Sequence, residues 1–240
     1  MKTSLFTTER KKPEYYKGIL IHADSMLHRQ AEQLLVRYVS RGASVIDIGA
    51  GAGAFSQRML DLGYEVTALD IDSEKFMPSE IPFIEADINR GILLISDKKY
   101  DAALCLEVVE HVENPWSLLR EIYEILKPGG VLILSTPNVT SFLSRLIFLC
   151  NGQFHQFRDA DLSYGHFRPI TAFELGMIAH RVGWRILETR PGGYLPVFEL
   201  TSVQPKALVF NILRGVVYLL ARGHKRGWCL FFVMEKPNHG

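Results

Sequence analysis

Short apolar stretches alternate with helical patterns along most of this chain, and this alternation limits its fold more than any other feature. The candidate strands are residues 44–48, 65–70, 82–85, 100–106, 131–135, 184–189 and 229–235. Apolar side chains also recur at helical spacing in residues 26–39, 55–62, 115–126 and 171–182. Such alternation predicts an α/β fold, in which helices cover both faces of a mainly parallel sheet.

The length and the charge balance of the chain favour a single domain. With 240 residues it can bury a sizeable core, but it is short for two domains of ordinary size. We expect one domain over residues 1–240, with a helical lead-in at 1–42 and two insertions, at 138–168 and 192–227. The net charge of +1, from 27 basic and 26 acidic side chains, gives no reason to expect a nucleic-acid partner.

Cysteine usage and the N-terminal sequence indicate a reducing compartment. Cys105, Cys150 and Cys229 are far apart and lie in apolar runs, which is typical of packed, reduced thiols. The N-terminus lacks the apolar stretch of a signal peptide. No run reaches the ~18 apolar residues of a membrane span. We therefore expect a cytoplasmic protein.

The stretch VIDIGAGAGAFSQRML leads from a strand through a glycine cluster into a helix, and it fits two nucleotide-binding patterns. Gly49, Gly51 and Ala54 match the dinucleotide fingerprint G-x-G-x-x-G/A, whereas Asp47 with the glycines up to Gly53 gives D-x-G-x-G-x-G. A pyrophosphate at a helix N-terminus requires bare amides and no nearby anion. The Asp47 carboxylate instead favours a nucleoside that carries an ammonium group.

Two further carboxylates follow the next strands. Asp70 ends a strand about 20 residues beyond the glycines, where a carboxylate accepts hydrogen bonds from ribose hydroxyls. Asp87 is placed to accept a hydrogen bond from an adenine amino group, with Ile71 and Ile88 on either side of the ring. The alternative for Asp87 is a helix cap, because Asp is a favoured N-cap residue.

Five segments then suggest a family. VIDIGAGAG, ALDID, EADI, AALCLEVVEHV and LKPGGVLILSTPN, in this order and spacing, resemble the class I S-adenosylmethionine-dependent methyltransferases, of the branch that includes the quinone-biosynthesis O-methyltransferases. The resemblance runs from about residue 43 to 139. It implies a Rossmann-like fold, with a seven-stranded, mainly parallel sheet, helices on both faces and an antiparallel last strand.

The resemblance also implies S-adenosylmethionine as the cofactor. Asp47 and the turn would hold its aminocarboxypropyl end, Asp70 its ribose and Asp87 its adenine. The predicted cofactor-binding residues are Asp47, Gly49, Ala50, Gly51, Gly53, Asp70, Ile71, Asp87, Ile88 and Leu106.

Two histidines are the candidate catalytic bases. His111 in EVVEHV and His166 in YGHFRP follow strands, and histidine titrates near neutral pH, which suits the removal of a proton from an acceptor hydroxyl. The alternative for His111 is a structural residue packed under the cofactor. The alternative for His166 is a hydrogen bond that orders its loop.

A metal site is a further possibility, and the sequence leaves it open. Residues three and four apart share a helical face, so Glu107 could meet Glu110 and His111, with His166 completing a set of oxygen and nitrogen ligands. Some methyltransferases with an E-x-x-E-H segment carry a metal there and others do not. Two solvated carboxylates beside a cleft are the alternative.

The two insertions bear on the methyl acceptor. Residues 206–221 predict a helix with a broad apolar face and basic ends, which packs either on the domain or in a membrane interface. Together with SFLSRLIFLC, this is compatible with a lipid-linked acceptor and with peripheral contact with the inner face of the membrane. Equally, the aromatic side chains of Phe154, Phe157, Tyr164 and Phe167 could form the wall of a site for an aromatic or sugar ring.

The sequence thus predicts O-methylation of a small or lipid-linked molecule. The rivals are an NAD-dependent oxidoreductase and a non-catalytic cofactor-binding partner of another enzyme. The sequence fixes neither the acceptor nor the oligomeric state.

Overall fold

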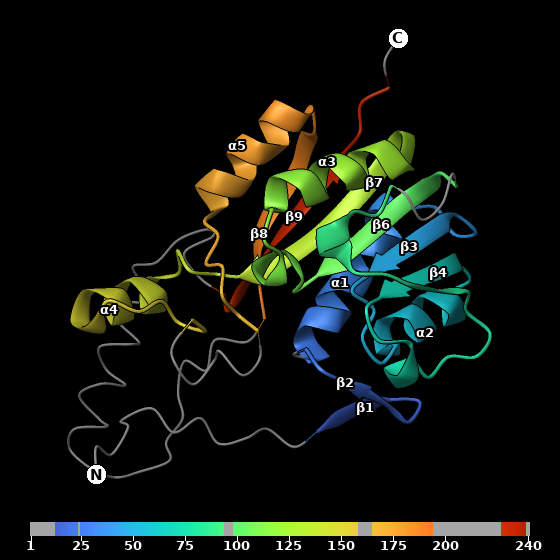
Figure 1. The fold of residues 1–240 in the computed structure, drawn as a ribbon, viewed down its shortest axis with the longest axis horizontal. Helices are drawn as coiled ribbons and strands as arrows, with labels where there is room; N and C mark the ends of the chain where they lie inside the picture. Colours follow the sequence, from blue (N-terminus) through green and yellow to red (C-terminus); the bar gives the residue numbers. More distant parts are fainter. Residues whose placement is uncertain (1–12, 24, 94–97, 158–164, 194–226, 239–240) are drawn as a thin grey trace.

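The computed structural model describes residues 13–23, 25–93, 98–157, 165–193 and 227–238 (Figure 1). The strands are β1 Glu14–Tyr16, β2 Ile19–Ile21, β3 Ser44–Ile48, β4 Glu65–Asp70, β5 Phe83–Glu85, β6 Tyr100–Leu106, β7 Leu126–Pro137, β8 Arg185–Gly192 and β9 Cys229–Glu235. The helices are α1 Ser25–Tyr38, α2 Ala54–Asp61, α3 Pro115–Ile125, α4 Phe142–Asn151 and α5 Ala172–Val182, with short 3-10 turns η1 Ser73–Lys75, η2 Ile88–Arg90 and η3 Val109–His111.

Seven strands form one sheet, in the order β5-β4-β3-β6-β7-β9-β8. β3 pairs in parallel with β4 on one side and with β6 on the other, so the order in which strands are added to the sheet reverses at β3. In an open α/β sheet this switch point is where a ligand binds, beyond the carboxyl ends of the strands. β9 runs antiparallel to β7 and β8, which confirms the predicted Rossmann-like sheet with a reversed last strand.

Helices cover both faces of the sheet, as predicted. α1 and α2 bury Leu34 and Met59 against one face. α3 and α5 bury Leu119 and Leu175 against the other, where the two helices lie side by side (Figure 1). Each fully buried Leu or Met stabilises the fold by about 1.5–3 kcal/mol relative to an exposed one.

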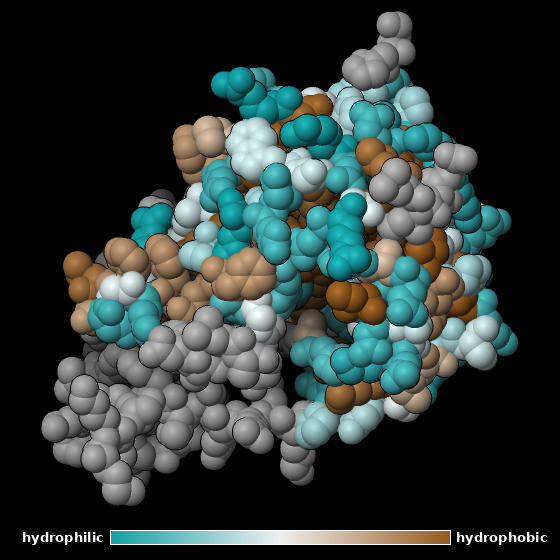
Figure 2. Space-filling model, in the orientation of Figure 1, coloured by the Kyte–Doolittle hydropathy of each residue, from teal (hydrophilic) through white to brown (hydrophobic). Residues whose placement is uncertain are grey.

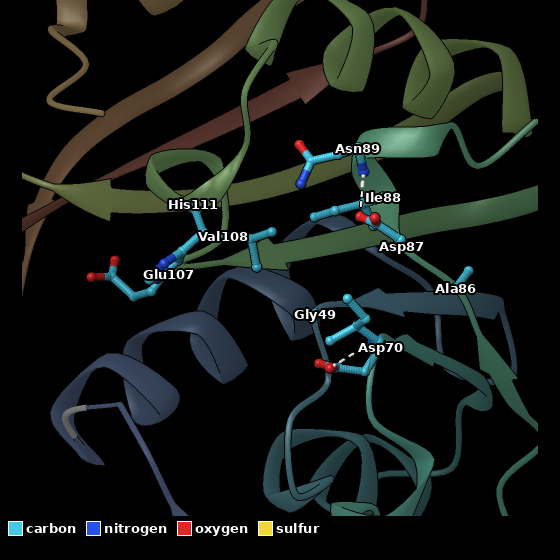
Figure 3. Close-up of a pocket in the computed structure, with 10 residues that line it drawn as sticks. Gly49, Asp70, Ala86, Asp87, Ile88, Asn89, Glu107, Val108 and His111 are labelled. Carbon is cyan, nitrogen blue, oxygen red and sulfur yellow. Dashed lines mark hydrogen bonds between the residues drawn. The ribbon is translucent and has the colours of Figure 1, made fainter. Parts of the chain in front are cut away.

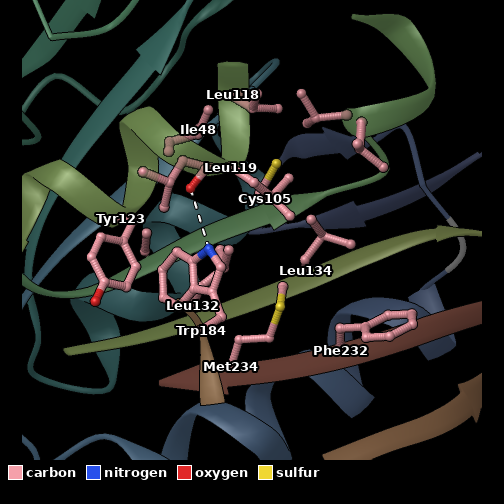
Figure 4. Packing of buried hydrophobic residues seen from close by; sticks show 14 of the residues in the cluster. Ile48, Cys105, Leu118, Leu119, Tyr123, Leu132, Leu134, Trp184, Phe232 and Met234 are labelled. Atoms are coloured by element: carbon pink, nitrogen blue, oxygen red, sulfur yellow. Dashed lines mark hydrogen bonds between the residues drawn. The ribbon is translucent and has the colours of Figure 1, made fainter. Parts of the chain in front are cut away.

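An aromatic pair joins α3 to the start of β8 (Figure 4). The Trp184 indole Nε1 donates a hydrogen bond of 3.3 Å to the carbonyl of Leu119, which satisfies its polar atom in the core. Its ring meets Tyr123 edge to face, with ring centroids 5.0 Å apart. Phe232 and Met234 of β9 belong to the same core. The reversed strand is therefore part of the main core.

The strands predicted at 44–48, 65–70, 100–106 and 229–235 are confirmed with the same bounds. The strand predicted from residue 131 begins earlier, at Leu126, because Leu126 already pairs with Tyr100 before a shift in register. The lead-in expected to be helical contains the β1–β2 hairpin before α1, and SFLSRLIFLC provides the N-cap of α4 and all but its last residue. Three-residue strands carry too little periodicity to be recognised.

Two expectations fall outside the described residues. The helix predicted at 206–221 and most of the insertion at 192–227 lie there. In the part of the chain that is described, every helix is too short or too polar to cross a bilayer.

Candidate active site

A cavity of about 320 Å³ lies beyond the carboxyl ends of the central strands, at the switch point (Figure 3). Its wall consists of Gly49, Asp70, Ile71, Ala86, Asp87, Ile88, Asn89, Glu107, Val108 and His111. Five predicted cofactor-binding residues and one candidate base are in this set. The volume falls in the range of ordinary ligand sites.

The glycine turn brings backbone against the cavity. Gly49 has a φ of +77°, and a Cβ there would lie only 2.4 Å from Cγ2 of Val108. The amides of Gly49 and Ala50 both donate to the carbonyl of Leu69, which fixes the turn to β4. Ala50, Gly51 and Gly53 belong to the turn but not to the cavity wall.

Asp70 is held at the end of β4 by backbone donors. Its Oδ2 accepts a hydrogen bond of 2.7 Å from the amide of Gly51, and its Oδ1 accepts one of 2.7 Å from the amide of Ile71. A carboxylate oxygen accepts more than one hydrogen bond, so both oxygens keep capacity for ligand hydroxyls.

Asp87 is the cap that one interpretation of the sequence suggested, and its position leaves the adenine-binding interpretation open. It caps the 3-10 turn η2 by accepting from the amide of Asn89 at 3.0 Å, and it also lines the cavity. Ile71, at 63% exposure, and the half-buried Ile88 flank the opening. Asn89, which the sequence analysis missed, adds an amide side chain to the wall.

Asp47 is buried beneath the turn and lies outside the cavity wall. It accepts a hydrogen bond of 2.5 Å from the hydroxyl of Ser56 on α2. Burial raises the pKa of Asp47 to about 6, Ser56 opposes the rise, and the Asp70 carboxylate adds to it. At neutral pH this carboxyl is still ionised, as a buried negative charge. Leu106, also in the predicted set, lies at the end of β6 outside the wall.

The structure brings Glu110, His111 and His166 together, with one ligand atom from each within 4.8 Å of the others. The two imidazoles meet edge to face, with centroids 4.9 Å apart. His111 Nδ1 lies 2.9 Å from the carbonyl of Gly165, and His166 Nδ1 lies 3.0 Å from that of Gln156. A carbonyl only accepts, so both Nδ1 atoms carry the proton and both Nε2 atoms present lone pairs in the neutral rings.

Glu110 is fully buried beside these rings. Its Oε2 accepts from the hydroxyl of Thr136 at 3.2 Å, whereas its Oε1 has no hydrogen-bond partner among the described residues. Burial raises the pKa of Glu110 well above its ordinary value, and the Glu107 carboxylate adds to the rise. Such an oxygen beside two imidazole nitrogens fits either a proton or a divalent cation.

Glu107 does not join the other three as the helical spacing predicted. It has a φ of +54° at the end of β6, and its Oε1 accepts from the hydroxyl of Ser135 at 2.8 Å. The segment is therefore a turn followed by η3 rather than a continuous helix, which turns Glu107 toward β7. The structure thus brings together Glu110, His111 and His166, and Glu107 lies apart from them.

Comparisons with known sequences identify the family to which this chain is related. Residues 23–189 match the family model described as a methyltransferase domain. A ubiquinone biosynthesis O-methyltransferase from Xanthomonas campestris is 33% identical over 117 residues, which are 45% of this chain and 49% of that protein. The chain thus spans about half the length of the curated relatives it matches.

Solved structures share the fold. A SAM-dependent methyltransferase from Archaeoglobus fulgidus gives a TM-score of 0.58 at 20% identity, covering 87% of this chain and 94% of that one. The Burkholderia thailandensis 1,6-didemethyltoxoflavin-N1-methyltransferase, solved with S-adenosylhomocysteine bound, gives 0.56 at 18% identity, covering 89% and 80%. None of these matches supports an oxidoreductase or a non-catalytic partner. The chain belongs to the methyltransferase domain family.

Proposed function

We propose that this chain transfers a methyl group from S-adenosylmethionine to a hydroxyl oxygen of a small or lipid-linked acceptor. One observation carries the proposal: the cavity that holds Asp70 and Asp87 is also lined by His111, which contacts His166. The oxygen as target is supported by the O-methyltransferase relatives.

Residues in the cavity wall and beneath the glycine turn suit the ribose, the adenine and the ammonium group of the cofactor. Asp70 would accept hydrogen bonds from the two ribose hydroxyls, and Asp87 one from the adenine amino group. Ile71 and Ile88 supply apolar surface for the purine ring. The buried charge of Asp47 would attract the ammonium group, and the bound ammonium would in turn lower the pKa of Asp47.

The reaction needs little beyond alignment and a base. The acceptor oxygen attacks the methyl carbon, the carbon–sulfur bond breaks, and its electron pair returns to sulfur, leaving the neutral thioether S-adenosylhomocysteine. The acceptor proton passes to Nε2 of His166 or His111, whose lone pair is held ready by the hydrogen bond at Nδ1. Holding acceptor and cofactor in line supplies most of the remaining acceleration.

The unpartnered Oε1 of Glu110 supports a second candidate, in which Glu110, His111 and His166 hold a divalent cation. Such a cation, when bound, lowers the pKa of a coordinated hydroxyl. The hydrogen bonds at the two Nδ1 atoms would then orient the imidazoles as ligands. Turnover abolished by EDTA and restored by Mg²⁺ or Zn²⁺ supports the cation, and EDTA-resistant turnover supports the histidine base alone.

Contact with the inner face of the membrane is supported by α4. This helix exposes 47% of Phe148 and 82% of Leu149, with the cation of Arg145 also exposed, and Figure 2 shows apolar side chains gathered over it. Apolar and basic residues on one short helix suit a bilayer surface carrying anionic lipids. The proposed location is the cytoplasm at that surface.

Vesicle sedimentation tests this contact. Leu149→Glu should reduce binding to vesicles of phosphatidylethanolamine and phosphatidylglycerol, whereas Met77→Glu, at another exposed apolar residue, should not. Equal binding by all three proteins would count against the membrane contact.

The activity itself is tested by following the methyl group. Cells with and without the protein are fed methyl-labelled methionine, and metabolites that gain one labelled methyl are identified. We expect a product with a new methoxy group that also forms with purified protein, S-adenosylmethionine and the acceptor. Purified protein that binds NADH and fails to bind S-adenosylmethionine would contradict the proposal.

A further inference from the structure

The β1–β2 hairpin is fastened to α2, directly beside the glycine turn. The hydroxyl of Tyr16 and the ammonium of Lys17 each lie 2.7 Å from a carboxylate oxygen of Asp61. The guanidinium of Arg58 lies 4.3 Å from the centre of the Tyr16 ring. The hairpin and the turn also share a small apolar cluster, made of Ile19, Ile21, Ala52 and Ala54. These contacts give the end of β2 a defined position over the turn.

His22 is the first residue after β2, and it stands over the turn. Its Cδ2 atom lies 3.8 Å from the position that a Cβ would take on Gly51. Gly51 is also the residue whose amide binds Asp70. The imidazole is exposed, and it has no hydrogen-bond or ion-pair partner among the described residues. Its ring nitrogens are therefore available to a ligand at the turn.

The cavity wall provides no lysine or arginine that could bind the carboxylate of the cofactor. S-adenosylmethionine carries a carboxylate as well as an ammonium group, yet the cavity wall contains the acids Asp70, Asp87 and Glu107 and neither lysine nor arginine. Of the cations near the turn, Lys17 pairs with Asp61 and Arg58 pairs with Glu32 at 2.6 Å. A carboxylate bound among fixed acids needs a donor of its own, since burial without one is costly.

The N-terminus of α2 also favours a negatively charged group at this position. Its N-cap is Gly53, which provides no side-chain hydrogen bond to the first amides. Free amides at a helix start attract an anion. The cofactor's carboxylate would lie between these amides and the imidazole above the turn.

The geometry points to His22 as the residue that binds the carboxylate of the cofactor, an inference that rests on the proposed cofactor. The imidazole donates a hydrogen bond from a ring nitrogen to this carboxylate. The hairpin thereby becomes part of the binding site for the amino-acid end of the cofactor, while the sheet residues bind the nucleoside.

Calorimetric titration with two ligands tests the inference. S-adenosylhomocysteine carries the carboxylate, and its decarboxylated form, the S-adenosyl thiopropylamine, lacks only that group. His22→Ala should weaken binding of S-adenosylhomocysteine about tenfold, as expected for loss of a hydrogen bond to a charged group. Binding of the decarboxylated form should change less than about twofold. His22→Gln, which keeps an N–H donor, should recover part of the loss.

Two comparisons make the result specific. His180→Ala, an exposed histidine on α5, should bind both ligands as the wild type does. Unchanged binding of S-adenosylhomocysteine by His22→Ala would overturn the inference, as would an equal loss for both ligands, which would indicate a displaced hairpin. Wild-type protein that binds neither ligand would instead refute the proposed cofactor.

Discussion

At the scale of single residues, the two carboxylates of the stretch ALDID can be compared directly: Asp70 is the last residue of β4, and Asp72 follows the strand. Asp70 lines the cavity, whereas Asp72 caps the exposed turn η1 and pairs with Lys75. Asp70→Ala should weaken binding of S-adenosylhomocysteine by roughly 10-fold to 100-fold, because a buried ribose loses charged acceptors. Asp72→Ala should leave binding unchanged. Calorimetric titration of both variants checks this, and equal affinities would remove Asp70 from the site.

His166 should affect the chemistry and leave cofactor binding intact. His166→Ala should slow turnover about 100-fold or more, as is usual for loss of a proton-transfer group. Affinity for S-adenosylhomocysteine should stay within about twofold of wild type, since His166 is outside the cavity wall. Single-turnover rates with the acceptor found by methyl labelling provide the measurement. A variant that turns over at the wild-type rate would leave His166 with a structural role, through its contacts to Gln156, His111 and Phe157.

The sequence predicted the positions of the acidic residues that line the cavity, but it did not predict the neighbouring amide residues. Asp70 and Asp87 stand at strand ends, where spacing alone predicts a side chain at the sheet edge. Asn89 and Gln156 gave no such signal. Asn89 reaches the cavity because it lies in the three-residue turn η2. The carbonyl of Gln156 contacts His166, and Gln156 has a φ of +68°, a backbone conformation that its residue type does not predict.

At the scale of elements, two glycines in the turn between β3 and α2 are subject to different constraints: both have a positive φ, but only Gly49 lacks space for a side chain. Gly49 faces Val108 at a distance that leaves no space for a methyl group, whereas a Cβ at Gly51 would meet only the edge of His22 at 3.8 Å. Gly51→Ala should cost about 1–2 kcal/mol of stability from its positive φ alone. Gly49→Ala adds overpacking and should cost about 2–5 kcal/mol. Urea unfolding of both variants checks the order, and equal losses would contradict it.

The central elements were predictable and the additions were not. β3, β4, β6 and β9 are apolar runs of five to seven residues buried on both faces, which is a strong pattern. The hairpin has strands of three residues and a turn at Lys17 and Gly18 with positive φ values of 49° and 83°. Its position depends on contacts with α2, which are remote in sequence and leave no periodic trace.

At the scale of the whole molecule, the buried charge of Asp47 should make stability depend on pH. The folded pKa of about 6 lies above the ordinary value of 3.8, so the folded state binds this proton more tightly than the unfolded state does. The free energy of unfolding should therefore fall as pH rises from about 4 to 6. Above that range the loss should stay constant, at roughly 2–3 kcal/mol.

The variant Asp47→Asn measures how much the buried charge of Asp47 contributes to this pH dependence. Its asparagine carbonyl can still accept a hydrogen bond from Ser56, but it carries no charge. The difference in unfolding free energy between the variant and the wild type should shift by roughly 2–3 kcal/mol in favour of the variant between pH 4 and pH 7. Urea titrations at these two pH values measure it. A difference that does not move with pH would mean that Asp47 is solvated.

The reversed strand has a consequence for how such a protein diversifies. Gly192, where β8 ends, is opposite Cys229, where β9 begins, and Cys229 is also opposite Pro137, where β7 ends. Both added segments are thus anchored at the same rim of the sheet, by strands that need no change when the segments do. Segments of different length or sequence can therefore be inserted between these anchor points without a change in the pairing of β7, β8 and β9.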